Sequence, residues 1–600
     1  MAPPASDLRS HSYDVVVIGA GGAGLRAAIE ASAQKAKVAL VCKSLLGKAH
    51  TVMAEGGAAA ALGNVMSEDN WRVHFRDTMR GGKMHNDWRM AQIHAQEAPD
   101  RINELEAWGA LFDRTPDGRI NQRPFGGHTY SRLAHVGDRT GLEMIRVLQD
   151  KGVHSGIEVH MECTIVRLFV VGGRIAGALG YFRETGRFVL FRTGAIVLAT
   201  GGIGKAWQIT SNSWEYTGDG HALAYEAGAE LIDMEFVQFH PTGMVWPPSV
   251  RGILVTEGVR GEGGVLKNAT GERFMFRYMP DLFKGDFAET EVEADAWVKG
   301  ERKKNRRPPE LLTRDVVAKA ITKEIAEGRG TPHGGVLLDI ASKQNPDYIK
   351  KKLPSMYHQF KELAHVDITK DAMEIGPTTH YVMGGVKVDA ETQESTVPGL
   401  YAAGEVGGGM HGANRLGGNS LSDLLVFGRR AGLHAAEKRG TPPHIPDADV
   451  DIAMKEALAP FDRPDGENPY AVQSALQAVM QRHAGIIRDR LGLETALAEL
   501  DKLKVRALET GITGSREYNP GWHTAIDLRS LLVVSEATAH AALERKESRG
   551  AHTRSDYPDS DDKQAREQIV IKKEGARMTV RRETQPPLPA DLMNLIKEGK

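Results

Sequence analysis

The chain has 600 residues, with 76 basic and 78 acidic side chains that give a formal net charge of −2 at pH 7. This balance argues against a general nucleic-acid binder, and the length is too great for a single hydrophobic core. Only two cysteines occur, Cys42 and Cys163, which excludes a disulfide framework, favours a reducing compartment and leaves too few ligands for a four-cysteine iron–sulfur cluster.

Residues 1–12 contain prolines and serines, and we expect them to form a disordered lead. They lack the hydrophobic segment of a signal peptide, and no run in the chain approaches the ~20 apolar residues that span a bilayer. We therefore expect a soluble chain that reaches a membrane only through a partner protein.

A buried strand is predicted over Tyr13–Ile18, followed by a helix over Leu25–Ala33 and a second strand over Lys37–Cys42. A glycine-rich turn joins the first strand to the helix and consists of Gly19, Ala20, Gly21, Gly22, Ala23 and Gly24. In such a unit the glycines allow a tight turn, admit a pyrophosphate and bring the helix close to the strand. The pattern predicts a Rossmann-like α/β domain that binds a dinucleotide at this turn.

The residues after the second strand depart from the dinucleotide pattern. An acidic residue normally stands there and holds the adenosine ribose, but this chain has Cys42, Lys43 and Ser44. We expect these three residues to line the cofactor site without the usual acidic contact.

A glycine- and alanine-rich run over residues 47–57 follows, and it contains His50. A histidine there can face the isoalloxazine of a bound flavin, although a lone histidine is more often an ordinary loop residue. The same run supplies further candidate cofactor contacts, namely Thr51, Glu55, Gly56 and Gly57.

The next segments are assigned from their periodicity. Helical patterns occur within residues 64–150, β-hairpins are predicted over Val166–Leu190, and another buried strand over Ala195–Ala199 ends in a glycine turn. Asp219 opens a helix, which it can cap unless it contacts the cofactor instead. At about residue 241 the pattern changes to turns and polar strands, so we place a capping domain at 241–376, inserted into the first domain.

The first domain thus comprises residues 13–240 and 377–440. Its second part contains a strand over Leu400–Ala403, with Glu405 just beyond it, and a helix to about Glu437 that Ser420 can cap. We expect Glu405, Ser420 and Leu421 to contact the cofactor, because a helix N-terminus stabilises negative charge.

The C-terminal part divides in two. Helical periodicity predicts a helical bundle over 441–545, and residues 546–600 are predicted to be a charged, loop-rich tail. In the capping domain, the highly charged segment 284–310 is expected to be a solvent-exposed loop. The alternative is a loop that docks a partner protein.

Five short segments place His, Arg, Thr or Glu beside glycine or proline, as loops that line a cleft do. They are Gln238–Gly243, Thr256–Gly264, Arg314–Val317, His380–Gly385 and His411–Ser420. Each polar residue taken singly is more often a surface or capping residue, but together they predict a site for a small polyanion.

These ordered motifs resemble the flavoprotein subunit of succinate dehydrogenase and fumarate reductase from about Tyr13 to Tyr557. The late segment Arg545–His552 also matches that family. The resemblance implies an FAD-binding domain with an inserted lid, followed by a helical domain. It further implies that His50 carries a covalent 8α-histidyl bond to FAD, which would raise the reduction potential of the flavin.

The resemblance also implies roles for the polar segments. His240 and Thr256 bind one carboxylate of succinate, while His380 and Arg415 hold the other. Arg314 removes a methylene proton, and Glu257 belongs to the relay that carries it away. No metal site is implied.

As an enzyme, the chain is expected to be the flavoprotein subunit of a membrane-associated succinate:quinone oxidoreductase. Its implied partners are membrane-anchor cytochrome b or quinone-binding subunits, together with an iron–sulfur subunit. The expected location is the cytoplasmic side of the bacterial inner membrane. Glu55 stands where succinate dehydrogenases often have Gln and fumarate reductases have Glu, so fumarate reduction is the alternative direction.

Two other hypotheses stand beside this one. L-aspartate oxidase and soluble fumarate reductases share the fold and the dicarboxylate loops, but they lack a histidine that links flavin at the position of His50. A flavin-containing scaffold protein without turnover would not need the full set of dicarboxylate residues.

Overall fold

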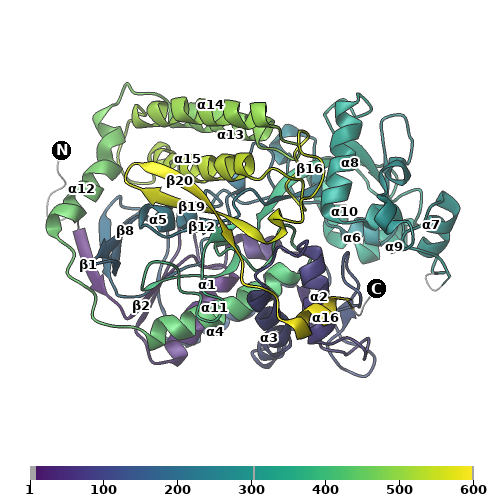
Figure 1. Cartoon of the computed structure of the whole chain (residues 1–600), viewed down its shortest axis with the longest axis horizontal. Helices are drawn as coiled ribbons and strands as arrows, with labels where there is room; N and C mark the ends of the chain where they lie inside the picture. Colours follow the sequence, from purple (N-terminus) through teal and green to yellow (C-terminus); the bar gives the residue numbers. More distant parts are fainter. Residues whose placement is uncertain (1–7, 302–303, 598–600) are drawn as a thin grey trace.

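The computed structural model describes residues 8–301 and 304–597, and its central element is a five-stranded parallel sheet (Figure 1). The strand order is β18-β11-β2-β3-β7, with bounds of Val15–Ile18 for β2, Val38–Val41 for β3, Glu158–His160 for β7, Ile196–Leu198 for β11 and Leu400–Ala402 for β18. All strands except β7 are buried throughout, as in parallel sheets covered by helices. The return of β18 after a long insertion confirms the predicted α/β class.

Two helices, α1 (Gly22–Ala33) and α11 (Asn419–Glu437), pack closely against each other beside this sheet. Gly428 and Gly432 of α11 permit the approach, since a Cβ atom at these positions would lie 2.7 and 2.2 Å from backbone oxygens of α1. Each helix follows a strand of the parallel sheet, so both N-termini lie at its carboxyl edge. Ligands of α/β folds bind at that edge.

A second sheet has the order β1-β10-β9-β8, with bounds of Leu8–Ser12, Phe188–Arg192, Arg174–Phe182 and Cys163–Val171. Strands β8 to β10 confirm the predicted hairpins. The prediction of a disordered lead is wrong for residues 8–12, because β1 pairs in parallel with β10. Its polar sequence carries no apolar alternation, so only the partner strand reveals it. Residues 1–7 lie outside the described part.

The capping domain has its own four-stranded sheet and hydrophobic core. The sheet order is β13-β16-β15-β14, with bounds of Val237–Met244, Met373–Val382, Val336–Asp339 and Val265–Lys267. Helices of this domain are α6 Gly258–Gly261, α7 Glu291–Val298, α8 Arg314–Ala326, α9 Pro346–Lys352 and α10 Pro354–Leu363; they form the teal end of the molecule in Figure 1. The predicted boundaries after 240 and 376 fall inside the paired strands β13 and β16, which cross between the domains.

The charged segment 284–310 folds around ion pairs of its own. Arg306 bonds to Glu289 and Glu293, and helix α7 lies within the segment. Phe287 and Ala288 are buried beside these charges. Lys303 and its neighbour at 302 lie outside the described residues. Other charges of the segment pair outside it, since Asp295 and Glu310 both bond to Arg273.

The helical domain consists of α12 Asp447–Leu458, α13 Pro469–His483, α14 Arg490–Leu508 and α15 Pro520–Glu544. Helices α13, α14 and α15 pack on one another along the top of Figure 1. Helix α15 also contacts α5 (Asp219–Glu226) of the first domain. The predicted helical bundle is confirmed, and it shares a hydrophobic core with the first domain.

The predicted loop-rich tail is wrong for residues 567–584 and 590–597. Strands β19 (Glu567–Glu574) and β20 (Arg577–Thr584) form a hairpin that joins β12 (Leu231–Ile232) and β17 (Gly385–Val386) in one sheet. A last helix, α16 (Ala590–Lys597), packs on α2 (Trp71–Gly81). Strand β20 is half exposed and rich in charged residues, so its sequence lacks the alternation of apolar and polar residues that predicts a strand. Within residues 8–301 and 304–597, no helix combines the length and apolarity required to cross a membrane.

Candidate active site

One continuous cavity runs from the glycine turn to the capping domain, and it is lined by every residue predicted for the site except Gly24. The lining includes Gly19, Ala20, Gly21, Gly22, Ala23, Cys42, Lys43, Ser44, His50, Thr51, Glu55, Gly56, Gly57, Asp219, His240, Thr256, Glu257, Arg314, His380, Glu405, Arg415, Ser420 and Leu421. Residues separated by hundreds of positions in the sequence thus face one space.

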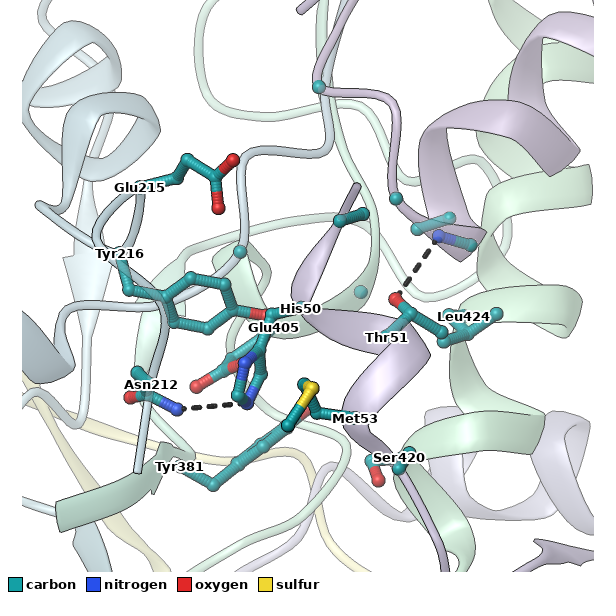
Figure 2. Close-up of a pocket in the computed structure, with 18 of the residues that line it drawn as sticks. His50, Thr51, Met53, Asn212, Glu215, Tyr216, Tyr381, Glu405, Ser420 and Leu424 are labelled. Atoms are coloured by element: carbon teal, nitrogen blue, oxygen red, sulfur yellow. Dashed lines mark hydrogen bonds between the residues drawn. The ribbon is translucent and has the colours of Figure 1, made fainter. Parts of the chain in front are cut away.

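The glycine turn has the geometry that a pyrophosphate site needs. Gly19 adopts a φ of +110°, and a Cβ atom at Gly24 would lie 1.8 Å from the Gly19 carbonyl oxygen. Gly24 therefore serves close packing and does not face the cavity, whereas Gly21 does. The Gly22 N–H donates to Thr51 Oγ1 at 3.3 Å, which ties the turn to the run after His50 (Figure 2). These residues fit a bound dinucleotide.

At the end of β3, Lys43 points into a pair of carboxylates. Its Nζ atom lies 2.9 Å from Asp219 Oδ2 and 2.6 Å from Asp527 Oδ1. Burial by itself lowers the pKa of Lys43, but the two carboxylates outweigh burial and hold the pKa above its usual value. The alternative that Asp219 caps its helix is wrong, since the N-cap is Gly218 at a φ of +79° and the Asp219 side chain makes no cap bond.

Next to it, Cys42 carries an inert thiol. Burial raises the pKa of Cys42 to about 12, so the thiolate is absent at neutral pH. The thiol donates to the Ser44 carbonyl at 3.0 Å. Both residues shape the cavity wall.

His50 begins a short 3-10 turn, η2 (His50–Met53), and its ring lies inside the cavity (Figure 2). Its Nε2 atom accepts a hydrogen bond from Asn212 Nδ2 at 3.3 Å, and its ring meets Tyr216 edge-on at 4.7 Å between centroids. Burial lowers the pKa of His50 to about 4, which leaves a neutral imidazole at neutral pH. The Nδ1 atom is buried and has no hydrogen-bond partner among the described residues.

Two histidines face the other end of the cavity. His240 lies in β13 and His380 in β16, with 5.2 Å between ring centroids. Burial and the nearby guanidinium of Arg314 hold the pKa of His240 well below its usual value, so the ring is neutral. His380 Nδ1 lies 2.9 Å from Ser211 Oγ, which orients that ring.

Two arginines of the cavity wall, Arg314 and Arg415, share one amide. Gln238 Oε1 accepts from Arg314 Nη1 at 3.3 Å and from Arg415 Nη2 at 3.1 Å. Arg415 also donates to Ser420 Oγ at 2.9 Å and lies over the Tyr381 ring. The prediction that Ser420 caps α11 is therefore wrong: Gly418 is the N-cap, and Ser420 holds Arg415 instead.

Glu257 lies between two arginines. Its Oε2 atom is 3.2 Å from Arg314 Nε and 3.6 Å from Arg260 Nη2. Burial by itself raises the pKa of Glu257, but Arg260 and Arg314 outweigh burial and hold the pKa below its usual value. An ionised carboxylate thus connects the arginine in the cavity to a second, fully buried arginine.

The comparisons with known proteins agree with this geometry. Two family models match, FAD binding domain over residues 14–421 and fumarate reductase flavoprotein C-term over residues 473–592. The chain is 39% identical over 585 residues to the succinate dehydrogenase flavoprotein subunit of Coxiella burnetii, covering 93% of this chain and 94% of that one. It is 37% identical over 566 residues to the fumarate reductase flavoprotein subunit of Mycobacterium tuberculosis, covering 92% and 93%.

A solved structure shows the same fold. Mycobacterium smegmatis Sdh1 in complex with UQ1 is 57% identical, with a TM-score of 0.86 and coverage of 96% of this chain and 95% of that chain. The chain belongs to the succinate dehydrogenase and fumarate reductase flavoprotein family. It is an FAD-binding oxidoreductase, and the predicted resemblance is confirmed.

In this flavoprotein, two carboxyl groups of the cavity resist ionisation. Burial raises the pKa of Glu55 and that of Glu405 to about 8 each. Glu55 Oε2 has no hydrogen-bond partner among the described residues, and Glu405 Oε1 accepts from the Val382 N–H at 3.0 Å. At neutral pH the buried Glu55 carboxyl therefore keeps its proton.

Several residues of the flavoprotein site were missed in the sequence. Gln238 and Arg260 lie within the polar segments but carried no predicted role. Asn212 and Tyr216 follow the glycine turn after β11, and their only signal is a polar stretch at that place. Phe125 lines the cavity and lies 6.0 Å from the Arg314 guanidinium. Each of these contacts depends on chain pairing that local patterns do not encode.

Proposed function

We propose that this chain is the flavoprotein subunit of a membrane-associated succinate:quinone oxidoreductase and that it oxidises succinate to fumarate. FAD, once bound, supplies the acceptor for a hydride from one methylene carbon of succinate. His50, Thr51, Glu55 and the glycine turn hold that cofactor, with Asp219, Glu405, Ser420 and Leu421 as further contacts.

One observation carries the proposal. Asn212 Nδ2 donates both to His50 Nε2 at 3.3 Å and to the His380 carbonyl at 2.9 Å. A single amide thus connects the histidine proposed to link the flavin with a histidine proposed to bind the substrate. The two sites are adjacent, as hydride transfer over a short distance requires.

The dicarboxylate is held at both ends. His240 and Thr256 bind one carboxylate, and His380 and Arg415 bind the other. The Arg415 guanidinium is oriented by Gln238 and Ser420 before the substrate arrives. A fork of two N–H groups suits a carboxylate better than an ammonium does. Succinate bound this way presents its methylene groups to the middle of the cavity.

Arg314 removes the proton from the second methylene carbon. Arginine is a weak base in water, but this guanidinium lies beside the fully buried Arg260 and Arg415. Glu257, in contact with Arg314, takes a proton from that guanidinium as Arg314 takes one from the methylene carbon, and then releases the proton from the site. The capping domain supplies Arg314, Glu257 and Thr256, so closure of that domain would complete the site and exclude water.

We propose that His50 forms the covalent bond to FAD, because its ring is neutral, lies in the cavity and has one nitrogen, Nδ1, without a hydrogen-bond partner among the described residues. The test is a denaturing gel of purified protein viewed under ultraviolet light. A fluorescent band from the wild type and none from His50→Ser is the expected result. A wild-type band without fluorescence would exclude the covalent bond. The His50→Ser protein should lose succinate oxidation before it loses fumarate reduction.

Electrons need a partner to leave this chain. Among the described residues there is no cluster of three or more His, Cys, Asp or Glu that could hold a metal. We propose that an iron–sulfur subunit receives the electrons and that membrane-anchor subunits form the quinone site. The location would then be the cytoplasmic side of the bacterial inner membrane. Purification from membranes with and without detergent, followed by identification of co-purifying chains, checks this arrangement.

Fumarate reduction is the second candidate. The chain is 39% identical to a succinate dehydrogenase flavoprotein subunit and 37% identical to a fumarate reductase flavoprotein subunit, with nearly the same coverage. The decisive measurement is the ratio of succinate oxidation to fumarate reduction by the assembled complex, with ubiquinone and menaquinol compared. An L-aspartate oxidase activity is disfavoured by His50, and it would appear as aspartate-dependent flavin reduction.

A further inference from the structure

We propose that Asp527, on α15 of the helical domain, is a positioning residue for the cofactor, so that the helical domain sets the affinity for FAD. The inference rests on the proposed FAD site. It concerns the adenosine end of the cavity, where the usual acidic residue after β3 is replaced by Lys43. Asp527 itself does not line the cavity.

The ammonium of Lys43 has no donor left for a ligand. An ammonium carries three N–H groups, and here they bond to Asp219 Oδ2, Asp527 Oδ1 and Thr217 Oγ1 at 2.9, 2.6 and 2.9 Å. Lys43 therefore contributes to ligand binding by fixing the side chains to which it bonds. Of its two carboxylate partners, Asp219 is the one that lines the cavity.

Asp219 remains able to bind a hydroxyl group. Its two oxygens accept one bond each, from Lys43 and from Thr217 Oγ1, whereas a carboxylate has about four acceptor sites. Its side chain is also more open than that of Asp527, at 18% exposure against 10%. A vicinal diol, as in the ribose of a nucleoside, offers the matching donors.

Asp527 leaves Asp219 available for a ligand because it is a second carboxylate partner of the Lys43 ammonium. A buried ammonium with one carboxylate would draw Asp219 into a tight pair, with less of its charge available to a ligand. With two carboxylates around one ammonium, Asp219 shares the charge of Lys43 with Asp527 and keeps more of its own charge for hydroxyl donors. Since Asp527 lies 484 positions from Lys43, it ties the helical domain to the end of β3.

The same helix provides a matched control. Glu536 of α15 pairs with Lys504 of α14 at the surface of the bundle. Removing that carboxylate weakens the helical domain without touching the cavity. A merely structural role for Asp527 predicts the same result for both residues, whereas a positioning role separates them.

The test is an FAD titration of the full chain in a His50→Ser background, which keeps binding reversible. Asp527→Asn should raise the Kd for FAD about 10-fold or more, as expected when a buried ion pair loses one partner. Asp527→Glu should restore most of the affinity, and Glu536→Gln should change it by less than about 2-fold.

Equal FAD affinity in the parent and in Asp527→Asn, or equal losses in Asp527→Asn and Glu536→Gln, would overturn the inference while leaving the proposed function intact. A parent that binds no FAD would overturn both. If Asp527→Asn does not fold, Lys43→Gln carries the same test, because it removes the connection from α15 to Asp219. Unchanged affinity in that variant would also reject the proposal.

Discussion

The two ends of the cavity are built on opposite charge balances. At the proposed dicarboxylate end, the ionised carboxylate of Glu257 lies between Arg260 and Arg314, and Gln238 joins Arg314 to Arg415. At the adenosine end, a single ammonium, that of Lys43, is surrounded by two carboxylates. Both clusters are buried, so neither imbalance is screened strongly by water.

The difference indicates what each end binds. Surplus positive charge in a buried site is costly until an anion enters, which suits a substrate with two carboxylates. Carboxylate oxygens with free acceptor sites accept hydroxyl donors, which suits a ribose. Variants at the dicarboxylate end should therefore change turnover and leave FAD binding alone, and the Arg314→Ala prediction tests that separation directly.

The largest effect is expected for Arg314→Ala. Succinate oxidation measured with a dye acceptor should fall by about 10²–10⁴-fold, the range for loss of a general acid–base group. Flavin content, read from absorbance, should stay the same. The matched control is Arg306→Ala in the same domain, where the lost surface ion pairs should change activity by less than about 2-fold. Retained activity in Arg314→Ala would rule out its proton role.

Gln238→Leu should have the next largest effect. The variant removes the acceptor that both Arg314 and Arg415 share, so the guanidiniums should separate and kcat/KM should fall about 10-fold. Gln393 is an equally buried glutamine that bonds to the backbone of its own turn. Gln393→Leu should thus lose stability without losing kcat/KM. If both variants lose activity equally, the bridge has no special role.

A smaller effect is expected for Gly126→Ala. The added methyl group would lie 2.8 Å from Glu257 Oε1, so it should displace that carboxylate and slow turnover by about 3- to 10-fold, as a mispositioned proton acceptor does. At Gly261 a methyl group meets nothing within 4 Å, which makes Gly261→Ala the control. A normal rate in Gly126→Ala would remove Glu257 from the relay.

The smallest effect at neutral pH is expected for Glu55→Gln. Because burial raises the pKa of Glu55 to about 8, the wild-type group is neutral below that pH and resembles glutamine. The KM for succinate at pH 7 should differ by less than about 2-fold. Above pH 8 the wild-type carboxylate ionises and repels the dianion, so its KM should rise while that of the variant stays flatter. Identical pH profiles would contradict the assignment.

Local patterns in the sequence predicted much of this protein. The turn from Gly19 to Gly24, the strands β2, β3 and β11, and the helical bundle follow from glycine spacing and hydrophobic periodicity alone. The order of the His, Arg and Glu motifs was sufficient to predict that they share a site. Each of these features is encoded within a short stretch of chain, where composition and spacing carry the information.

Only the tertiary structure decided the rest. Strand β1 and the C-terminal hairpin exist because partner strands distant in sequence complete their hydrogen bonds. Ser420 bonds to Arg415 and does not cap α11 as predicted. Burial raises the pKa of Glu55 and so determines its protonation. Asp527 contacts Lys43 although the two residues lie 484 positions apart in the sequence. Pairing and desolvation are properties of the packed molecule, so no short stretch of sequence could reveal them.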